Sequence, residues 1–444
     1  MMLSFLIAIL PCTLPQVAPA THQSKTRKIY ALDDPQLKIP LSVEEAVIQG
    51  HRNNPETFMT RAATGSAFEA WKSLRASPPI TVGLTQVQGS SPEPTLIGEP
   101  RDTILDIGHV LDTSGQRRFQ AAEAKSTFRS TQLQAQENLV FLEHEIRDAY
   151  WTLAAMRAQL KIAQISLAEA KRIESLSQTQ VVAGAVPKTD VLRASIEVAN
   201  AEQAVTTAEA AERTAQILLN NFLARPQQST INLTVDISDE NVEVSAAEET
   251  NVKDLTAKAL ANRPLFLTSV EQVTAAKYAL KQAEASRFPD VTFLYSRSLV
   301  QSLDTIGVNI SFPLIDFGSV RHSISSAKWL REQAEATQAD VQQQVTQEVS
   351  QACSDLTAAM KSAQSYKRRA LEPSIQLATL AKTGYSHGAT SILAVIDAES
   401  TQRNSRVTYI NCLLSVYKAS DAVRAAVGTS LSTTTSLSVY QPKR

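Results

Sequence analysis

The chain has 444 residues, a formal net charge of −1, 5% aromatic residues and 13 glycines. A near-neutral charge with no Lys/Arg cluster argues against a nucleic-acid partner, and few glycines and aromatics favour long helices over packed α/β layers. The six histidines and three cysteines lack the spacing of a metal site, and no catalytic motif stands out, so we expect no enzyme, no metal and no cofactor.

Residues 1–20 are predicted to be a signal peptide. Leu3 to Leu10 form a short uncharged apolar core, and Ala18–Pro19–Ala20 supplies small residues at the spacing that a signal peptidase accepts. No Lys or Arg precedes the apolar run, so a disordered apolar tail is the alternative. No later stretch reaches the roughly 18 uncharged apolar residues of a membrane-spanning helix. We therefore expect an exported chain.

The chain contains a duplicated module. Five residues of one copy recur about 203 positions later in the other: Gly115, Arg118, Ala124, Lys125 and Glu145 correspond to Gly318, Arg321, Ala327, Lys328 and Glu348. Further along, Gly184 recurs about 204 positions later as Gly388. This period is too long for a solenoid unit. We expect a first repeat at 41–223, a linker at 224–250, a second repeat at 251–427 and a C-terminal tail at 428–444.

Each repeat has two segments in which apolar residues alternate with small or polar ones, at about 80–88 and 103–111 and again at about 291–299 and 304–312. Segments of about ten residues with this pattern are typical of strands tilted through a bilayer. Four such strands cannot close a barrel, which needs about eight, and open strand edges are not tolerated in lipid. We therefore expect several copies to combine their strands, and three copies would provide twelve.

Helices precede each pair of strands, and a long helical hairpin follows it, at 116–223 and at 320–427. Ten apolar residues from Leu139 to Ala170 are spaced alternately three and four apart, which is the pattern of a coiled-coil seam. The arm from about Gln116 to Val181 has neither Pro nor Gly and would be about 100 Å long. Gly184 and Gly388 are predicted to form the hairpin tip turns.

Four motifs follow one another along the chain: Ser42–Val43–Glu44–Glu45–Ala46 with Asn53–Asn54–Pro55–Glu56; Gly184 with Thr189–Asp190–Val191–Leu192; Phe312–Pro313–Leu314–Ile315–Asp316–Phe317–Gly318; and Tyr385–Ser386–His387–Gly388 with Val395–Ile396–Asp397–Ala398. Their order, spacing and duplication resemble the TolC-like outer-membrane efflux family from about Leu41 to Gly428. The first strand-to-helix junction, Asp112–Thr113–Ser114–Gly115, departs from the family pattern because it has no aromatic residue.

The resemblance implies a mainly α fold with a membrane β-barrel contribution, in which a homotrimer forms a twelve-stranded β-barrel continued by a twelve-helix α-barrel. It implies an outer-membrane channel, surrounded by lipid and extending into the periplasm, in a tripartite efflux or type I secretion system. Substrate would pass passively from an inner-membrane transporter and a periplasmic adaptor to the exterior. A coiled-coil envelope tether without channel activity is the alternative, and the cargo of a channel could be a drug, a metal ion or a protein.

The resemblance also implies a gate at the hairpin tips. Asp190 and Tyr385 match the family positions whose carboxylate and hydroxyl latch the resting tunnel; alternatively, Asp190 decorates the return helix and Tyr385 packs at the turn. Asp397 matches a carboxylate in the narrow periplasmic mouth, where three copies would favour cations; alternatively, it is solvated on the outer face. Thr390 and Ala394 stand where some members carry an Arg and a second acidic residue, so the latch and the selectivity are expected to be weaker.

Overall fold

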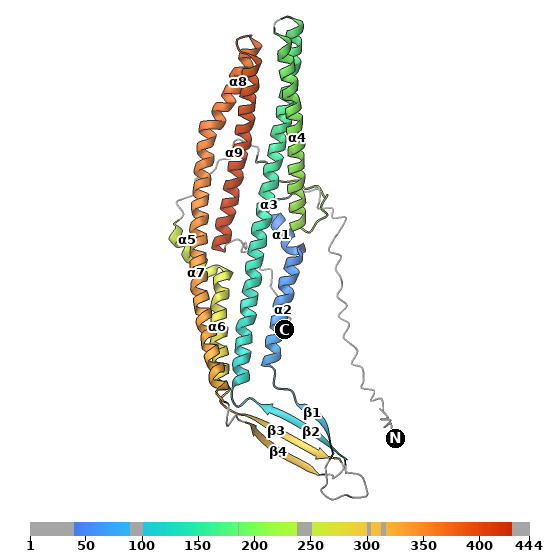
Figure 1. Cartoon of the computed structure of the whole chain (residues 1–444), viewed down its shortest axis with the longest axis vertical. Helices are drawn as coiled ribbons and strands as arrows, with labels where there is room; N and C mark the ends of the chain where they lie inside the picture. The colour runs from blue at the N-terminus through green and yellow to red at the C-terminus, as the bar shows by residue number, and fades with distance from the viewer. Residues whose placement is uncertain are drawn as a thin grey trace, which may run out of the picture.

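The computed structural model describes residues 40–88, 101–184, 186–237, 251–299, 303–311 and 317–428. Several predicted segments lie outside these ranges: the signal peptide, the loop from Gly89 to Pro100, the second part of the linker (238–250), residues 312–316 of the second junction and nearly all of the C-terminal tail. The described residues form an elongated set of long helices with a β-sheet at one end (Figure 1).

The two repeats contain the same series of elements. The first has helices α1 (Val43–Asn53) and α2 (Pro55–Arg75), strands β1 (Thr81–Gln88) and β2 (Arg101–Leu111), and the hairpin of α3 (Gln116–Val182) and α4 (Lys188–Phe222). The second has α5 (Val252–Asn262), α6 (Pro264–Ala285), β3 (Asp290–Ser298), β4 (Asp304–Ser311), α7 (Ser319–Tyr366), the π-helix η2 (Lys367–Leu371), α8 (Glu372–Ser386) and α9 (Ile392–Val427). Each strand begins and ends within about two residues of its predicted range.

Local chemistry sets several of these boundaries. At the start of α1, the Ser42 hydroxyl accepts from the Glu45 amide (3.2 Å), and the Glu45 carboxylate accepts from the Ser42 amide (3.0 Å), which is a capping box. Gly115 and Gly318 immediately precede α3 and α7 and have left-handed backbones, with φ of 73° and 88°. Glycine adopts this conformation without the steric cost of a Cβ, which explains why the glycine recurs in both repeats.

The four strands form one antiparallel sheet in the order β1–β2–β3–β4. The register aligns Val82, Ile107, Tyr295 and Ile306 in one row across the sheet, and the next row is Gly83, Asp106, Ser296 and Thr305. Because neighbouring rows point to opposite faces, one face is apolar and the other is small or polar. On the polar face, Asp106 accepts hydrogen bonds from Ser296 (2.6 Å) and Thr85 (3.3 Å).

The predicted seam of α3 is the core of the helical region. Its residues Leu142, Ile146 and Leu153 are almost fully buried, and they pack against α1 and against Ala215 and Leu219 of α4. Farther along α3, a second cluster is shared with α9 and includes Leu413. The longest helix therefore holds both repeats together. In the described ranges, no helix combines the length and the apolarity that crossing a bilayer requires.

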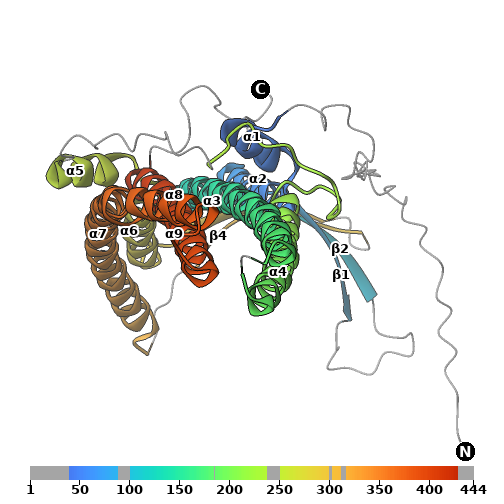
Figure 2. The same ribbon diagram turned by 90° about the horizontal axis from the view of Figure 1, so that it is seen from above.

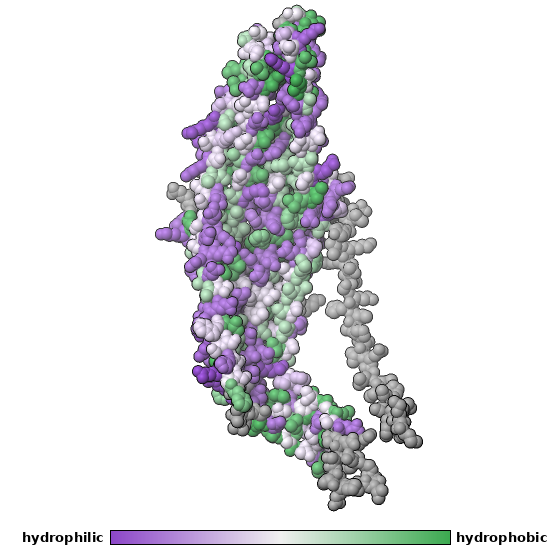
Figure 3. All heavy atoms as spheres, in the orientation of Figure 1, coloured by the Kyte–Doolittle hydropathy of each residue, from purple (hydrophilic) through white to green (hydrophobic). Residues whose placement is uncertain are grey.

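Seen along the long axis, the helices form one curved row, with α1 and α5 on its convex side (Figure 2). In the half nearest the sheet, the neighbours run in the order α7, α6, α3 and α2; in the other half, α3 lies between α4 and α9. Polar side chains cover much of the helical surface, whereas apolar patches appear at the sheet and near the tips (Figure 3).

A buried polar group, here called the α3–α9 charge cluster, consists of Glu143, Arg147, Trp151 and Asp421. Arg147 lies 3.1 Å from Glu143 and 3.8 Å from Asp421, and the Trp151 indole donates a 2.7 Å hydrogen bond to Asp421. The side chains of Glu143 and Asp421 are only 3% and 6% exposed. Burial raises the pKa of both carboxyl groups, and this effect outweighs the opposing attraction of Arg147.

The sequence predicts the second long arm as one helix from about 320 to 385, and the structure instead divides this arm. The five-residue π-helix η2 separates α7 from α8, and Leu371 at its end is buried beside Tyr409 and Ile410 of α9. Pro373 follows at the start of α8, where a residue without a backbone N–H disrupts the regular helix pattern. The corresponding arm of the first repeat, α3, is uninterrupted over 67 residues.

Candidate functional site

The two hairpin tips lie side by side at the end of the molecule opposite the sheet (Figure 1). Gly184 and Gly388 lie in the connections between the paired helices, and both have a left-handed backbone with φ of 73°. The amide of Gly184 donates to the Val181 carbonyl and that of Gly388 to the Tyr385 carbonyl, each at 3.0 Å. The chain therefore reverses at the two glycines that correspond in the repeats.

Tyr385 connects the two hairpins. Its ring is 4% exposed, and its hydroxyl lies 3.1 Å from the hydroxyl of Ser177 on α3. Ser177 in turn donates to the Ile173 carbonyl (2.9 Å), which leaves the tyrosine hydroxyl as the donor between the two. Asp190 is half-buried in the first turn of α4, where a negative charge suits the helix dipole. The single chain thus joins Tyr385 to Ser177 and not to Asp190, and a latch between Asp190 and Tyr385 stays a prediction.

Asp397 is exposed on α9, while its neighbours Val395 and Ala398 are buried. Val395 belongs to an apolar cluster that also contains Ile392 and Tyr385 and holds α3, α4, α8 and α9 together at the tips. The carboxylate of Asp397 therefore lies off the packed face of its helix. Its proposed role in ion selection depends on neighbouring copies of the chain and stays a prediction.

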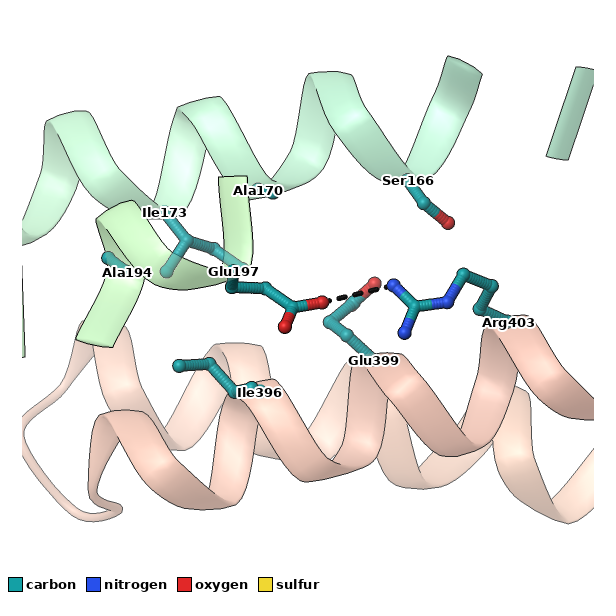
Figure 4. Close-up of a pocket in the computed structure, with 8 residues that line it drawn as sticks. All are labelled: Ser166, Ala170, Ile173, Ala194, Glu197, Ile396, Glu399 and Arg403. Atoms are coloured by element: carbon teal, nitrogen blue, oxygen red, sulfur yellow. Dashed lines mark hydrogen bonds and ion pairs between the residues drawn. The ribbon is translucent and has the colours of Figure 1, made fainter. Parts of the chain in front are cut away.

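Sequence reasoning missed a set of ion pairs between the hairpins, here called the cross-hairpin ion pairs. Arg403 of α9 pairs with Glu197 of α4 at 3.0 Å (Figure 4). Lys382 of α8 pairs with Glu169 of α3 at 3.3 Å, and within its own hairpin it also pairs with Glu399 of α9 at 2.7 Å. These links and the Tyr385 hydroxyl tie the α8–α9 hairpin to the α3–α4 hairpin.

One sequence signal could have identified part of this set. Glu197 lies between Ala194 and Ala201, which are both buried on the seam of α4. A carboxylate at a seam position needs a cation on the facing helix. The pattern does not say which helix faces it, however, because Arg403 is 206 residues away.

The space beside these ion pairs is too small for a ligand. A recess of about 10 Å³ is lined by Ser166, Ala170, Ile173, Ala194, Glu197, Ile396, Glu399 and Arg403 (Figure 4). That volume accommodates about one water molecule. Within the described ranges, no group of three His, Cys, Asp or Glu side chains is placed to hold a metal ion. The tip region is thus a contact between two hairpins rather than a pocket for a small molecule.

Comparison with known proteins identifies the family. The model of the family "Outer membrane efflux protein" matches residues 100–225 and 255–429. The cobalt-zinc-cadmium resistance protein CzcC of Cupriavidus metallidurans is 26% identical over 345 residues, which cover 74% of this chain and 77% of CzcC. The pyoverdine export outer membrane protein OpmQ of Pseudomonas putida is 23% identical over 447 residues, which cover 94% of this chain and 93% of OpmQ.

Solved structures show the same fold. The outer-membrane channel OprN matches with a TM-score of 0.73 and 22% identity, over 89% of this chain and 90% of OprN. A structure of CusC matches with a TM-score of 0.75 and 17% identity, over 87% of this chain and 92% of that chain. Because the family model matches more than half of the sequence, the chain belongs to the outer membrane efflux protein family, whose members are TolC-like efflux channels and not enzymes.

Proposed function

We propose that this chain is the outer-membrane channel of a tripartite efflux or type I secretion system. It passively conducts substrate from an inner-membrane pump and a periplasmic adaptor to the cell exterior. The observation that carries this proposal is the sheet, whose apolar face and small or polar face suit a wall between lipid and water. The helices joined to it, up to about 100 Å long, suit a conduit across the periplasm.

The channel is proposed to be a homotrimer. β1 and β4 are the outer strands of the sheet, and an open strand edge in lipid leaves backbone groups without partners. Pairing β4 of one copy with β1 of the next removes both edges and gives a closed barrel of twelve strands. The curved row of helices continues in the same way into a barrel of twelve (Figure 2).

The gate is proposed to lie at the hairpin tips. Tyr385 holds the α8–α9 hairpin against α3 through Ser177, Asp190 is proposed as a further partner, and the cross-hairpin ion pairs add to this restraint. Three copies of Asp397 at the mouth would favour cations. The relatives' names include cobalt, zinc and cadmium resistance and pyoverdine export, and such different cargoes fit a wide conduit that does not bind what it conducts.

Purified protein in planar lipid bilayers tests the proposal against the envelope tether. A channel gives stepwise ion conductance, and its trimer migrates differently on a gel before and after heating. A tether gives neither conductance nor a heat-modifiable oligomer in outer-membrane fractions. Monomeric, non-conducting protein recovered from native membranes would overturn the proposal.

A further inference from the structure

One end of the helix row, on α7, carries an exposed tryptophan. Ile324 and Ala327 are buried on the side of α7 that faces α6, in a cluster with Leu280. Trp329 lies two residues beyond Ala327, about 200° around the helix, and is 69% exposed. Its indole therefore points away from α6, to the side on which the row of helices ends.

The other end of the row, on α2, carries small side chains. Thr64 and Phe68 are buried against α3, and the Phe68 ring lies 5.3 Å from that of Phe128. Ala62 and Ser66 lie two residues to either side of Thr64, about 160–200° around the helix, and both are exposed. This face has room for a large side chain between two small ones.

The two features lie at the same height above the sheet. Trp329 is about ten residues from the start of α7, and Ser66 is about nine residues from the end of α2, so each lies about 15 Å from the helix end nearest the sheet. α7 runs away from the sheet and α2 runs toward it (Figure 1). Helices at these heights, with opposite directions, can pack side by side.

Charge is complementary at the same level. Lys328 precedes Trp329, and Glu69 lies about one turn from Ser66; both are exposed. For antiparallel α7 and α2, helical geometry places these two side chains on the same side of the contact. Among the described residues of one chain, Glu69 forms an ion pair only with the exposed Lys72, at 3.8 Å. Such a pair contributes little to stability and leaves the carboxylate able to bind another cation.

We propose that Trp329 of one copy packs between Ala62 and Ser66 of the next copy, beside an ion pair between Lys328 and Glu69. This contact joins α7 to α2 and anchors the helical wall between subunits. The inference rests on the proposed trimer and specifies which surfaces meet in it. Large aromatic side chains enclosed by small neighbours are typical anchors of protein interfaces.

Cysteine cross-linking tests the contact directly. In a background with Cys353→Ala and Cys412→Ala, the pair Ser66→Cys with Trp329→Cys should give dimers and trimers with a short bifunctional thiol reagent in native membranes. Each single variant should give none. The control pair Ala63→Cys with Lys328→Cys lies at similar heights but on opposite sides of the contact, and it should also give none.

A second measurement keeps the test independent of the cysteine variants. Trp329→Ala should make the purified trimer dissociate at least about tenfold faster, whereas Trp329→Phe should retain most of the stability. The inference is overturned, and the channel proposal left intact, if the wild type forms trimers but the Ser66→Cys/Trp329→Cys pair gives no cross-link. The same holds if Trp329→Ala trimers dissociate at the wild-type rate. Absence of trimers in the wild type would overturn both.

Discussion

Replacement of Arg147 by methionine tests the energetics of the α3–α9 charge cluster. The variant keeps an unbranched side chain but removes the buried cation that lies 3.1 Å from Glu143 and 3.8 Å from Asp421. Only the more exposed Arg424, 3.7 Å from Asp421, remains in an ion pair with these carboxylates among the described residues. Unit charges 4 Å apart attract by about 4 kcal/mol at an effective dielectric constant of about 20. After desolvation is included, removal of one partner from a buried pair costs about 3–5 kcal/mol.

The expected change in melting temperature follows from the chain length. With an unfolding entropy of about 2.1 cal/mol/K per residue, a loss of about 3–5 kcal/mol over 444 residues lowers Tm by about 3–5 °C. Thermal unfolding of the detergent-purified protein, followed by tryptophan fluorescence, measures this change. Lys171→Met is the matched control, because Lys171 and Glu202 are each 55% exposed and their ion pair is worth at most about 1 kcal/mol.

The pH dependence distinguishes lost pairing from lost packing. Burial raises the pKa of Glu143 and Asp421 in the folded state. Their ionisation therefore opposes folding, and this cost appears as the pH rises through the raised pKa values and is absent when both groups are protonated. Arg147→Met raises both pKa values further, so its destabilisation should be greatest near neutral pH and should shrink as the pH falls. A destabilisation of equal size at neutral and acidic pH, or none at either, would refute the electrostatic reasoning.

Three further predictions concern the membrane wall and the gate. Val308→Arg on the apolar sheet face should cost about 2–4 kcal/mol in lipid and reduce trimer yield in outer membranes, whereas Asn309→Arg on the opposite face should be tolerated. Tyr385→Phe removes a hydrogen bond to Ser177 worth about 0.5–1.5 kcal/mol, or about 1.5–3 kcal/mol if the partner is a carboxylate, and should raise the single-channel open probability. The same effect in Ser177→Ala would show that the latch lies within one chain. Unchanged gating in both variants would mean that Tyr385 serves only in packing. Asp397→Ala should reduce cation preference, measured as reversal potential in asymmetric salt, and an unchanged value would locate the filter elsewhere.

Much of the fold follows from local patterns. The alternation of Ile306, Val308 and Ile310 with small or polar residues predicts β4, because side chains on a strand point alternately to two faces. The spacing from Leu139 to Ala170 predicts the buried seam of α3, because residues three and four apart share one helix face. Both patterns depend on neighbours in sequence, and a single chain is enough to display them.

The contacts between helices could not be predicted in this way. Arg403 and Glu197 form an ion pair because α4 and α9 pack together at the tips, and the sequence of neither helix indicates which helix it packs against. Tyr385 was singled out from a family motif, yet its partner within the chain is Ser177, which belongs to no motif. Helix pairing is decided by packing over the whole bundle, so a sequence pattern shows that a partner is needed without identifying it.

The π-helix η2 accommodates a difference in length between the two repeats. Gly318 and Gly388 are one residue farther apart than Gly115 and Gly184, because the first glycines of the two repeats differ by about 203 positions and the second by about 204. In a regular α-helix, one extra residue would turn everything beyond it by about 100°, and Tyr385 would face away from Ser177. A turn with i→i+5 hydrogen bonds takes up that residue within itself, so the helix continues with its original faces. The two arms therefore differ in length by one residue but present the same faces at the tips, and the pseudo-symmetry of the tips survives.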